Sequence, residues 1–354
     1  MKYKNILITG GAGFIGSNLA LSFRRRYPGL GITALDNLKR RGSELNLALL
    51  KENNIGFVHG DIRCPEDLVT NKNIDLVIEC SAEPSVLAGY DNPPYIINTN
   101  LNGTVNCLEF CRKHDADIVF LSTSRVYPYE AINDIKTKET GTRFEWVTGQ
   151  NIPGWSKNGL NENFTTFGAK TFYGATKLAS ELMLQEFMAN YSIKGVVNRC
   201  GVIGGPGQFG KVDQGIFTYW MLAHYFKKDL KYIGFGGKGK QVRDLLHVDD
   251  LFELVDLQVN DLSKFNGKVL NVGGGKFNLS LQETTRLCQK ISGNQVRISK
   301  DLKIRPGDIN IYITDNKKVE QASGWKPKRP PVEVLEDIFE WIGENEDLIV
   351  RSIF

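Results

Sequence analysis

The sequence predicts an α/β protein, a Rossmann-type doubly wound parallel sheet with a smaller, interleaved C-terminal domain. Two observations support this prediction. Short β-rich runs alternate with longer helical stretches over residues 1–199, and a glycine-rich turn directly follows the first run. The chain has 354 residues, of which 41% are hydrophobic, so it can bury the large core that such a fold needs.

The predicted strands are short and rich in aliphatic residues. They cover residues 5–9, 32–36, 57–59, 76–79, 118–122 and 196–199. Between them, segments such as 17–25, 104–113 and 177–191 have apolar residues at helical spacing. Alternation of this kind predicts crossover helices on both faces of a parallel sheet.

Residues 10–16, GGAGFIG, end the first strand and open the first helix. Glycine permits a tight turn and a close approach of the backbone to a pyrophosphate at the helix N-terminus. Asp36 ends the second strand, where a carboxylate would hydrogen-bond an adenosine ribose and repel a 2′-phosphate. The pattern therefore predicts NAD, although Arg40 and Arg41 could favour NADP. A turn that merely needs small residues would not explain the strand, the helix and the acid together.

After Arg199, glycine-rich turns at 204–207, 234–239 and 273–275 separate shorter elements. We therefore expect an NAD-binding Rossmann domain at residues 1–199 and a mainly substrate-binding domain at 200–354. Residues 240–275 would partly return to the first domain, because the β-rich run 269–272 suits its sheet. The final helix, predicted from roughly Pro331 to Gly343, has an apolar face that suits packing.

Thr123 follows the fifth predicted strand, and Tyr173 and Lys177 lie four residues apart on one helical face. A lysine ammonium beside the phenol, with a cationic nicotinamide nearby, favours phenolate. Lowering the pKa of a tyrosine from about 10 toward 7 takes roughly 4 kcal/mol. Alone, such a pair is usually ordinary helix surface, so its value depends on the accompanying glycine turn and Thr123.

The glycine turn, Thr123 and the YxxxK pair resemble the extended short-chain dehydrogenases over essentially the whole chain. This resemblance implies that Tyr173 takes a proton from a sugar hydroxyl, helped by Thr123, while the carbon beneath gives hydride to NAD. Lys177 would hold the ribose. The implied NAD contacts are Gly10, Gly13, Phe14, Ile15, Gly16, Asp36, Asn37, Arg41, Asp61, Ile62, Ser81, Asn100 and Lys177.

Residues 237–250, GKGKQVRDLLHVDD, and 305–308, RPGD, resemble the nucleotide-diphosphate contacts of nucleotide-sugar epimerases and dehydratases. The planar fork of an arginine suits a diphosphate, although either Arg243 or Arg305 could form a surface ion pair. The full set of expected substrate contacts is Glu83, Ser85, Ser124, Arg125, Arg199, Gln214, Gln241, Arg243, Arg305 and Asp308.

Two of these expectations follow from departures from the family pattern. Residues 79–84, ECSAEP, replace a histidine and two alanines that many relatives have after the fourth strand. Glu83 and Ser85 are therefore expected to face the sugar, with local packing as the alternative. Pro128 replaces the glycine that usually follows the Val-Tyr pair.

The 4,6-dehydratases have an acid pair directly after the threonine, where this chain has Ser124 and Arg125. Dehydration would therefore lack its general acid and base. Residues 204–215 and 239–244 are most similar to the CDP-paratose 2-epimerases, also called CDP-tyvelose epimerases. A UDP-hexose 4-epimerase is the main alternative, since it would use the same three catalytic residues with the sugar rotated.

Two further alternatives come from other functional classes. A non-catalytic dinucleotide-binding sensor or scaffold would have no physical reason to keep Thr123, Tyr173 and Lys177. A net dehydrogenase or reductase acting on a small carbonyl compound would leave Arg243 and Arg305 without a task. The long segment 129–172, with Trp146 and Trp155, is expected to be either a lid or a loop that its aromatics fix to the domain.

Composition limits the remaining possibilities. A net charge of +4, with basic residues spread along the chain, does not suggest nucleic-acid binding. Six cysteines and four histidines lack metal-ligand spacing, so no metal and a reduced, cytoplasmic protein are expected. The apolar run at 6–8 is too short for a signal or membrane segment. The resemblance implies a homodimer, or a higher homo-oligomer, through helices at 100–113 and 174–191.

Overall fold

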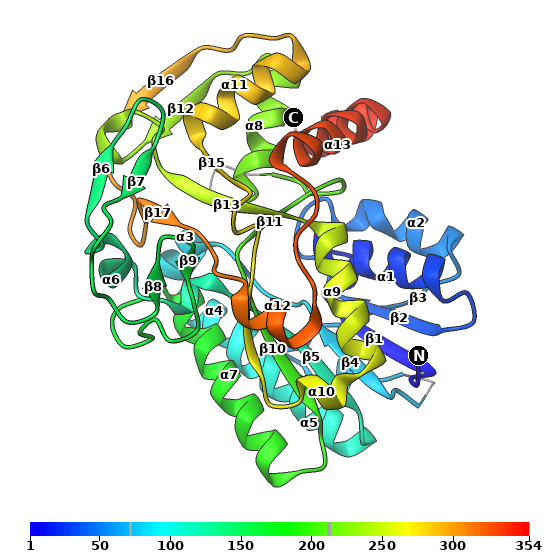
Figure 1. Ribbon diagram of the computed structural model, residues 1–354. Coiled ribbons are helices and arrows are strands. Elements are labelled where there is room, and N and C mark those ends of the chain that lie inside the picture. Colours follow the sequence, from blue (N-terminus) through cyan, green and yellow to red (C-terminus); the bar gives the residue numbers. More distant parts are fainter. Residues whose placement is uncertain (71–72, 211–213, 354) are drawn as a thin grey trace.

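The computed structural model describes residues 1–70, 73–210 and 214–353 (Figure 1). Within them, a seven-stranded parallel sheet has the order β14-β10-β5-β4-β1-β2-β3. The strands are β1 Asn5–Thr9, β2 Gly31–Asp36, β3 Gly56–His59, β4 Leu76–Glu79, β5 Asp117–Thr123, β10 Gly195–Cys200 and β14 Val269–Val272. Strand order reverses between β1 and β4, the point at which doubly wound sheets bind ligands beyond their carboxyl ends. The predicted fold class is confirmed.

Helices cover both faces of this sheet. Helices α1 (Phe14–Arg26), α2 (Asn46–Glu52) and α9 (Val248–Asn260) pack on one face, and α5 (Gly103–His114) and α7 (Phe172–Asn190) pack on the other. Along β1, Ile6 and Ile8 enter the first core and Leu7 enters the second, because successive strand residues point to opposite faces. Covering both faces explains the nearly continuous apolar strands.

The C-terminal part lies beyond the carboxyl end of the sheet (Figure 1). Its mixed sheet contains β11 (Val202–Gly204), β13 (Val242–His247), β15 (Asn278–Ser280) and β17 (Ile311–Tyr312). A second pair joins β12 (Leu230–Ile233) and β16 (Ile298–Asp301). Helices α8 (Ile216–Tyr225), α11 (Leu281–Ser292) and α13 (Pro331–Glu344) share one core. The chain returns through α9 and β14 to the large sheet, while the domain boundary at 199 stays a prediction.

Smaller elements complete the chain. Two hairpins, β6 (Thr137–Glu139) with β7 (Phe144–Trp146) and β8 (Trp155–Ser156) with β9 (Gly159–Leu160), lie in the long segment before α7. The shorter helices are α3 Val86–Asp91, α4 Pro93–Ile96, α6 Tyr129–Asn133, α10 Leu262–Phe265, α12 Lys317–Ser323 and α14 Glu346–Ile353. Helix α14 follows the one that we expected to be last.

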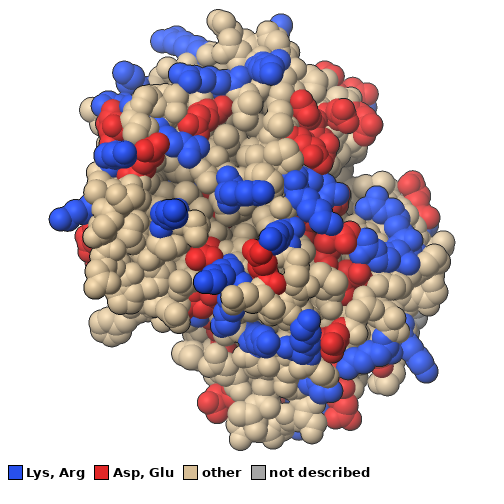
Figure 2. Space-filling model, in the orientation of Figure 1, with Lys and Arg blue, Asp and Glu red and all other residues tan. Residues whose placement is uncertain are grey.

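Charge and composition of the folded chain add three observations. On the face drawn in Figure 2, basic and acidic side chains are interspersed. Every helix in the described part of the chain is too short or too polar to span a bilayer. The same residues contain no group of three His, Cys, Asp or Glu side chains that could hold a metal ion.

Candidate active site

The glycine turn lies at the carboxyl end of β1, and its path depends on two glycines. Gly10 has a φ of +64°, a left-handed conformation that favours glycine. A Cβ on Gly16 would stand 2.2 Å from the carbonyl oxygen of Gly10. Helix α1 begins at Phe14, so its free amide groups border the cavity that the turn helps to form.

Asp36 lies beside this turn, at the end of β2. Its carboxylate accepts hydrogen bonds from the backbone N–H groups of Ala12, at 3.2 Å, and Leu38, at 2.8 Å. Burial raises the pKa of Asp36, and these hydrogen bonds oppose the rise. The carboxylate therefore stands at the cavity wall in the place that a ribose hydroxyl acceptor requires.

A cavity of about 380 Å³ extends from the turn to the end of β5, a size typical of ligand sites. Most of the expected NAD contacts line it: Gly10, Gly13, Phe14, Ile15, Gly16, Asp36, Asn37, Asp61, Ile62 and Ser81. The narrow glycine cradle, the helix N-terminus and the acid together fit a dinucleotide.

Three expected NAD contacts lie outside the cavity lining. Arg41 is absent from it, and the preceding residue, Arg40, lines it instead. Asn100 is completely buried, and its amide accepts from the Glu83 N–H at 2.8 Å and donates to the Glu83 carbonyl at 3.1 Å. Asn100 therefore fixes the loop after β4. The third, Lys177, is also buried behind the wall.

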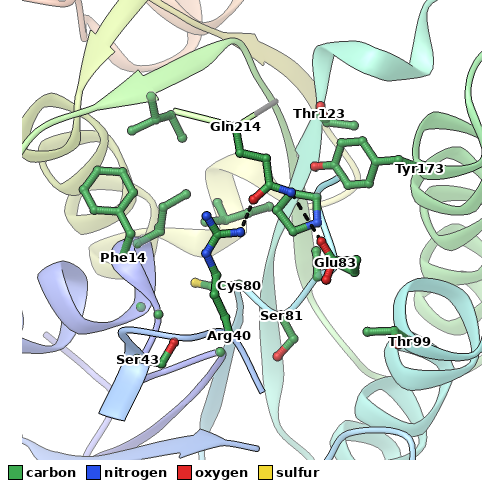
Figure 3. Close-up of a pocket in the computed structure, with 18 of the residues that line it drawn as sticks. Phe14, Arg40, Ser43, Cys80, Ser81, Glu83, Thr99, Thr123, Tyr173 and Gln214 are labelled. Carbon is green, nitrogen blue, oxygen red and sulfur yellow. Dashed lines mark hydrogen bonds between the residues drawn. The ribbon is translucent and has the colours of Figure 1, made fainter. Parts of the chain in front are cut away.

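Thr123 and Tyr173 meet at the end of the cavity, where Figure 3 shows both side chains. Thr123 ends β5, and Tyr173 lies in the first turn of α7, which Thr171 caps by accepting from the Gly174 N–H. Burial raises the pKa of Tyr173 to about 12, and a hydrogen bond with Thr123 opposes the rise. The protein alone therefore does not produce the lowered pKa that the sequence led us to expect.

Lys177 lies one turn after Tyr173 and contacts the sheet. Its Nζ is 3.5 Å from a carboxylate oxygen of Glu79, the last residue of β4. The same Nζ lies 4.0 Å from the ring centroid of Phe120 on β5. In this conformation Glu79 is the ionic partner of Lys177, which the sequence did not predict.

A second cavity, of about 500 Å³, continues from the first into the C-terminal part. Arg125 and Gln214 line both cavities, and Glu83 and Ser124 line the first. The remaining expected substrate contacts in the second are Gln241, Arg243, Arg305 and Asp308. The structure thus brings together eight of the ten expected substrate residues in one continuous space among the described residues.

Arg243 and Asp308 form the charged centre of the second cavity. An Arg243 Nη lies 3.0 Å from a carboxylate oxygen of Asp308 and donates to the Ile309 carbonyl at 2.6 Å. Burial lowers the pKa of Arg243 to about 10, so the guanidinium stays charged at neutral pH. Arg125 donates to the Gly307 carbonyl at 2.8 Å, which holds a second guanidinium near the boundary of the two cavities.

Arg199 and Ser85 do not line either cavity, and the structure gives each of them another role. Arg199 is buried and pairs with Glu181 of α7, at 2.7 Å. Ser85 is buried and caps α3 by accepting from the Ala88 N–H at 3.0 Å. The residue after Arg199, Cys200, lines the first cavity instead.

Sequence reasoning missed a polar bridge across the first cavity (Figure 3). Arg40 donates a hydrogen bond to the Gln214 side chain, which donates in turn to Glu83 at 3.3 Å. Three loops far apart in the sequence meet in this bridge, so no local motif could have revealed it. Residues 211–213, which contributed to the subfamily resemblance, lie outside the described part of the chain.

None of residues 129–172 lines either of these two cavities. A neighbouring cavity of about 400 Å³ is lined by Tyr129, Glu130, Asn133 and Asp134 together with Arg305 and Asp308, and the lid interpretation stays a prediction. Trp146 and Trp155 pack edge to face, with ring centroids 6.0 Å apart. Arg143, just before β7, forms an ion pair with Glu283 of α11. Both tryptophans also pack against a cluster that includes Ile309 and Tyr312, so this cluster and the ion pair fix the segment to the body of the protein.

A family model described as the NAD dependent epimerase/dehydratase family matches residues 6–273. A CDP-paratose 2-epimerase from Salmonella typhi is 32% identical, with 95% of this chain and 98% of the relative covered. A dTDP-glucose 4,6-dehydratase from Mycolicibacterium smegmatis is 27% identical, with 96% and 94% covered. The solved structure of a UDP-glucose 4-epimerase from Thermus thermophilus, in complex with NAD, has 25% identity and a TM-score of 0.76 over 96% and 99% of the chains.

Proposed function

We propose that this chain, which belongs to the NAD dependent epimerase/dehydratase family, converts CDP-paratose to CDP-tyvelose by inverting carbon 2 of the sugar. The observation that carries this proposal is the 32% identity to a CDP-paratose 2-epimerase over nearly the whole of both chains. The epimerase reaction and the use of NAD rest on the family, while the nucleotide and the carbon are our proposal.

The two cavities support a nucleotide sugar as substrate. Arg243 places a charged guanidinium in the lining of the second cavity, which would attract a diphosphate, and Arg125 lies between this site and Thr123. A substrate held in this way would place its sugar beside Tyr173. Neither Ser124 nor Arg125 has the carboxylate that elimination of a hydroxyl would need, which favours epimerisation over dehydration.

We assign the proton transfers to Tyr173. The phenolate accepts the proton of the sugar 2-hydroxyl, with Thr123 aligning both oxygens, as carbon 2 becomes a ketone. When bound, NAD supplies the hydride acceptor and later the hydride donor. The ketone turns over in the cavity, carbon 2 regains hydrogen on its other face, and Tyr173 returns the proton. No external oxidant is consumed.

The phenolate requires positive charge, because burial raises the pKa of Tyr173 to about 12. Lys177 and Arg125 are the cations of this chain that we propose to stabilise it. Removing the phenol should lower kcat by about 10²–10⁴-fold.

The test follows the sugar protons by NMR in deuterated water, with CDP-paratose and UDP-glucose supplied separately. We expect inversion at carbon 2 of the CDP sugar without solvent deuterium at that carbon. Tyr173→Phe should slow it by about 10²–10⁴-fold, and Tyr225→Phe, at a phenol that is paired with Glu346 and lines neither cavity, should retain it.

Two results would overturn the substrate assignment. Inversion at carbon 4 of the UDP sugar alone would make the chain a UDP-hexose 4-epimerase. Loss of a hydroxyl with solvent deuterium beside the ketone would make it a dehydratase.

We also propose a cytoplasmic homodimer. The described cysteines are all unpaired, which suits a reducing compartment. Leu182 on helix α7 is 57% exposed to solvent, and Tyr191, directly after the helix, is 46% exposed. Exposed apolar groups on this helix suit a helix-to-helix contact between two copies, which sedimentation measurements would test.

A further inference from the structure

The ion pair between Glu79 and Lys177 is the most deeply buried one beside the cavities. Relative exposure is 0% for the Glu79 side chain and 1% for the Lys177 side chain. Neither Glu79 carboxylate oxygen has a hydrogen bond of normal geometry within the described residues. Burial raises the pKa of Glu79, and the charge of Lys177, with a smaller contribution from the Ser81 N–H, opposes the rise. Lys177 meets the aromatic ring of Phe120 on its other side. Each charge is therefore compensated mainly by the other.

The remaining titratable groups that face this pair are neutral near pH 7. Burial raises the pKa of the facing thiols, which lie directly after β4, on α5 and on β10: Cys80, Cys107, Cys111 and Cys200. Burial likewise raises the pKa of Tyr173, on α7, to about 12. These groups cannot take over the role of the carboxylate as a counter-charge.

An ammonium ion taken out of water without a counter-charge releases its proton, because burial disfavours the charged form. A neutral Lys177 could not stabilise a Tyr173 phenolate. We propose that Glu79 is a positioning residue that keeps Lys177 protonated and holds it against the sheet, one turn behind Tyr173. The proposal rests on the proposed function only for the catalytic role of Lys177.

The proton count of the pair gives a signature that does not require cofactor or substrate. In the native chain, the Glu79 carboxylate and the Lys177 ammonium together carry one titratable proton in the folded state. At pH 7–9 the same two residues also carry one titratable proton in the unfolded state. Glu79→Gln leaves a neutral Lys177 in the fold, while the unfolded lysine stays charged. The unfolded state then binds about one proton more, so stability rises with pH.

The reciprocal variant has the opposite signature. In Lys177→Met, a buried Glu79 without its cation takes up a proton on folding, whereas the unfolded carboxylate is ionised above pH 6. Stability then falls as pH rises, again by about one proton per molecule. In the double variant both effects disappear.

The experiment measures the free energy of unfolding of the full-length chain by urea titration, without ligands, at pH 7, 8 and 9. The proteins are the native chain, Glu79→Gln, Lys177→Met and the double variant. Relative to the native and double-variant chains, we expect the free energy of unfolding to rise with pH for Glu79→Gln and to fall with pH for Lys177→Met. Equal slopes for all four proteins would overturn the proposal.

If Glu79→Gln does not fold, Lys177→Met alone still tests the pair, since a slope like that of the native chain would show that Glu79 needs no counter-charge. The activity readout is separate. For an active enzyme, Glu79→Gln should move the acidic limb of the profile of kcat against pH to higher pH. A limb at the same pH or at a lower pH would contradict the proposed effect of Glu79 on Tyr173. Failure of the substrate assignment would leave the stability slopes intact.

Discussion

The second charged pair on α7, Arg199 with Glu181, gives a sharp prediction about stability. The Arg199 Nε lies 3.1 Å from both carboxylate oxygens, and its Nη2 lies 2.7 Å from one of them. Side-chain exposure is 9% for Arg199 and 1% for Glu181. Glu181→Gln keeps the shape of the side chain but removes the negative charge, leaving a buried guanidinium without its counter-ion.

Breaking a buried ion pair from one side costs about 3–5 kcal/mol. That loss is a large fraction of the roughly 5–15 kcal/mol by which folded domains are stable. The pair Arg26 with Glu253 is the matched comparison, because both side chains are 37% exposed. An exposed pair contributes about 0–1 kcal/mol, so Glu253→Gln should change stability little.

The assay is urea unfolding followed by circular dichroism at pH 7 for the native chain and both variants. Glu181→Gln should lower the free energy of unfolding at least about threefold more than Glu253→Gln does. Replacing both partners, with Glu181→Leu and Arg199→Met, should recover most of the loss, because apolar side chains of similar volume need no counter-charge. A Glu181→Gln loss below about 1 kcal/mol would refute the view that the buried charge dominates at this position.

Two further predictions concern the cofactor cavity and the segment before α7. Gly16→Ala should raise the Kd for NAD, measured by calorimetry, about tenfold or more, because a Cβ 2.2 Å from the Gly10 carbonyl oxygen forces the turn apart. Gly29→Ala is the control, because a Cβ at Gly29 would have no atom within 4 Å. Equal affinities of the two variants for NAD would contradict the steric argument. Burial would raise the pKa of Glu283, but hydrogen bonds led by that from Arg143 outweigh it and lower the pKa to about 2. At pH values above the unfolded glutamate pKa of about 4.3, the depressed pKa of Glu283 contributes to the stability of the fold. This contribution disappears as the pH falls toward 2. Arg143→Met should therefore lower the urea midpoint at pH 6 and lose most of this difference by pH 3, and a constant gap would contradict the linkage.

The parallel sheet could be predicted from the sequence because its signals are local. The bounds of β1, β4 and β14 coincide with the predicted runs, and the other predicted strands differ by one or two residues. The start of α7 at Phe172 lies within two residues of the helix expected at 174–191, although apolar periodicity becomes evident only near 177. The cap that sets its start, Thr171, follows an irregular segment in which several polar residues could have served equally.

The expected site residues that lie outside the cavities have a common physical explanation. A position at the end of a strand predicts that a residue lies near the carboxyl edge, but the two faces alternate with every residue. At the end of β10, Cys200 faces the cavity, so Arg199 turns to the face that α7 covers. Asn100 shows the same limit for a helical segment, since its amide reaches a backbone loop that is distant in sequence. Register and long-range pairing decide such details, and neither is visible in a short string.

The two buried pairs on α7 explain together how the helix presents Tyr173. Lys177 reaches Glu79 on β4, and Glu181, one turn later, reaches Arg199 on β10. Strand β5 lies between β4 and β10, so the helix is tied on both sides of the strand that ends in Thr123. Because Lys177 and Glu181 lie four residues apart on one face of the helix, both pairs form only when that face is turned to the sheet. The pairs therefore specify one rotation of α7, and that rotation directs Tyr173 to the hydroxyl of Thr123.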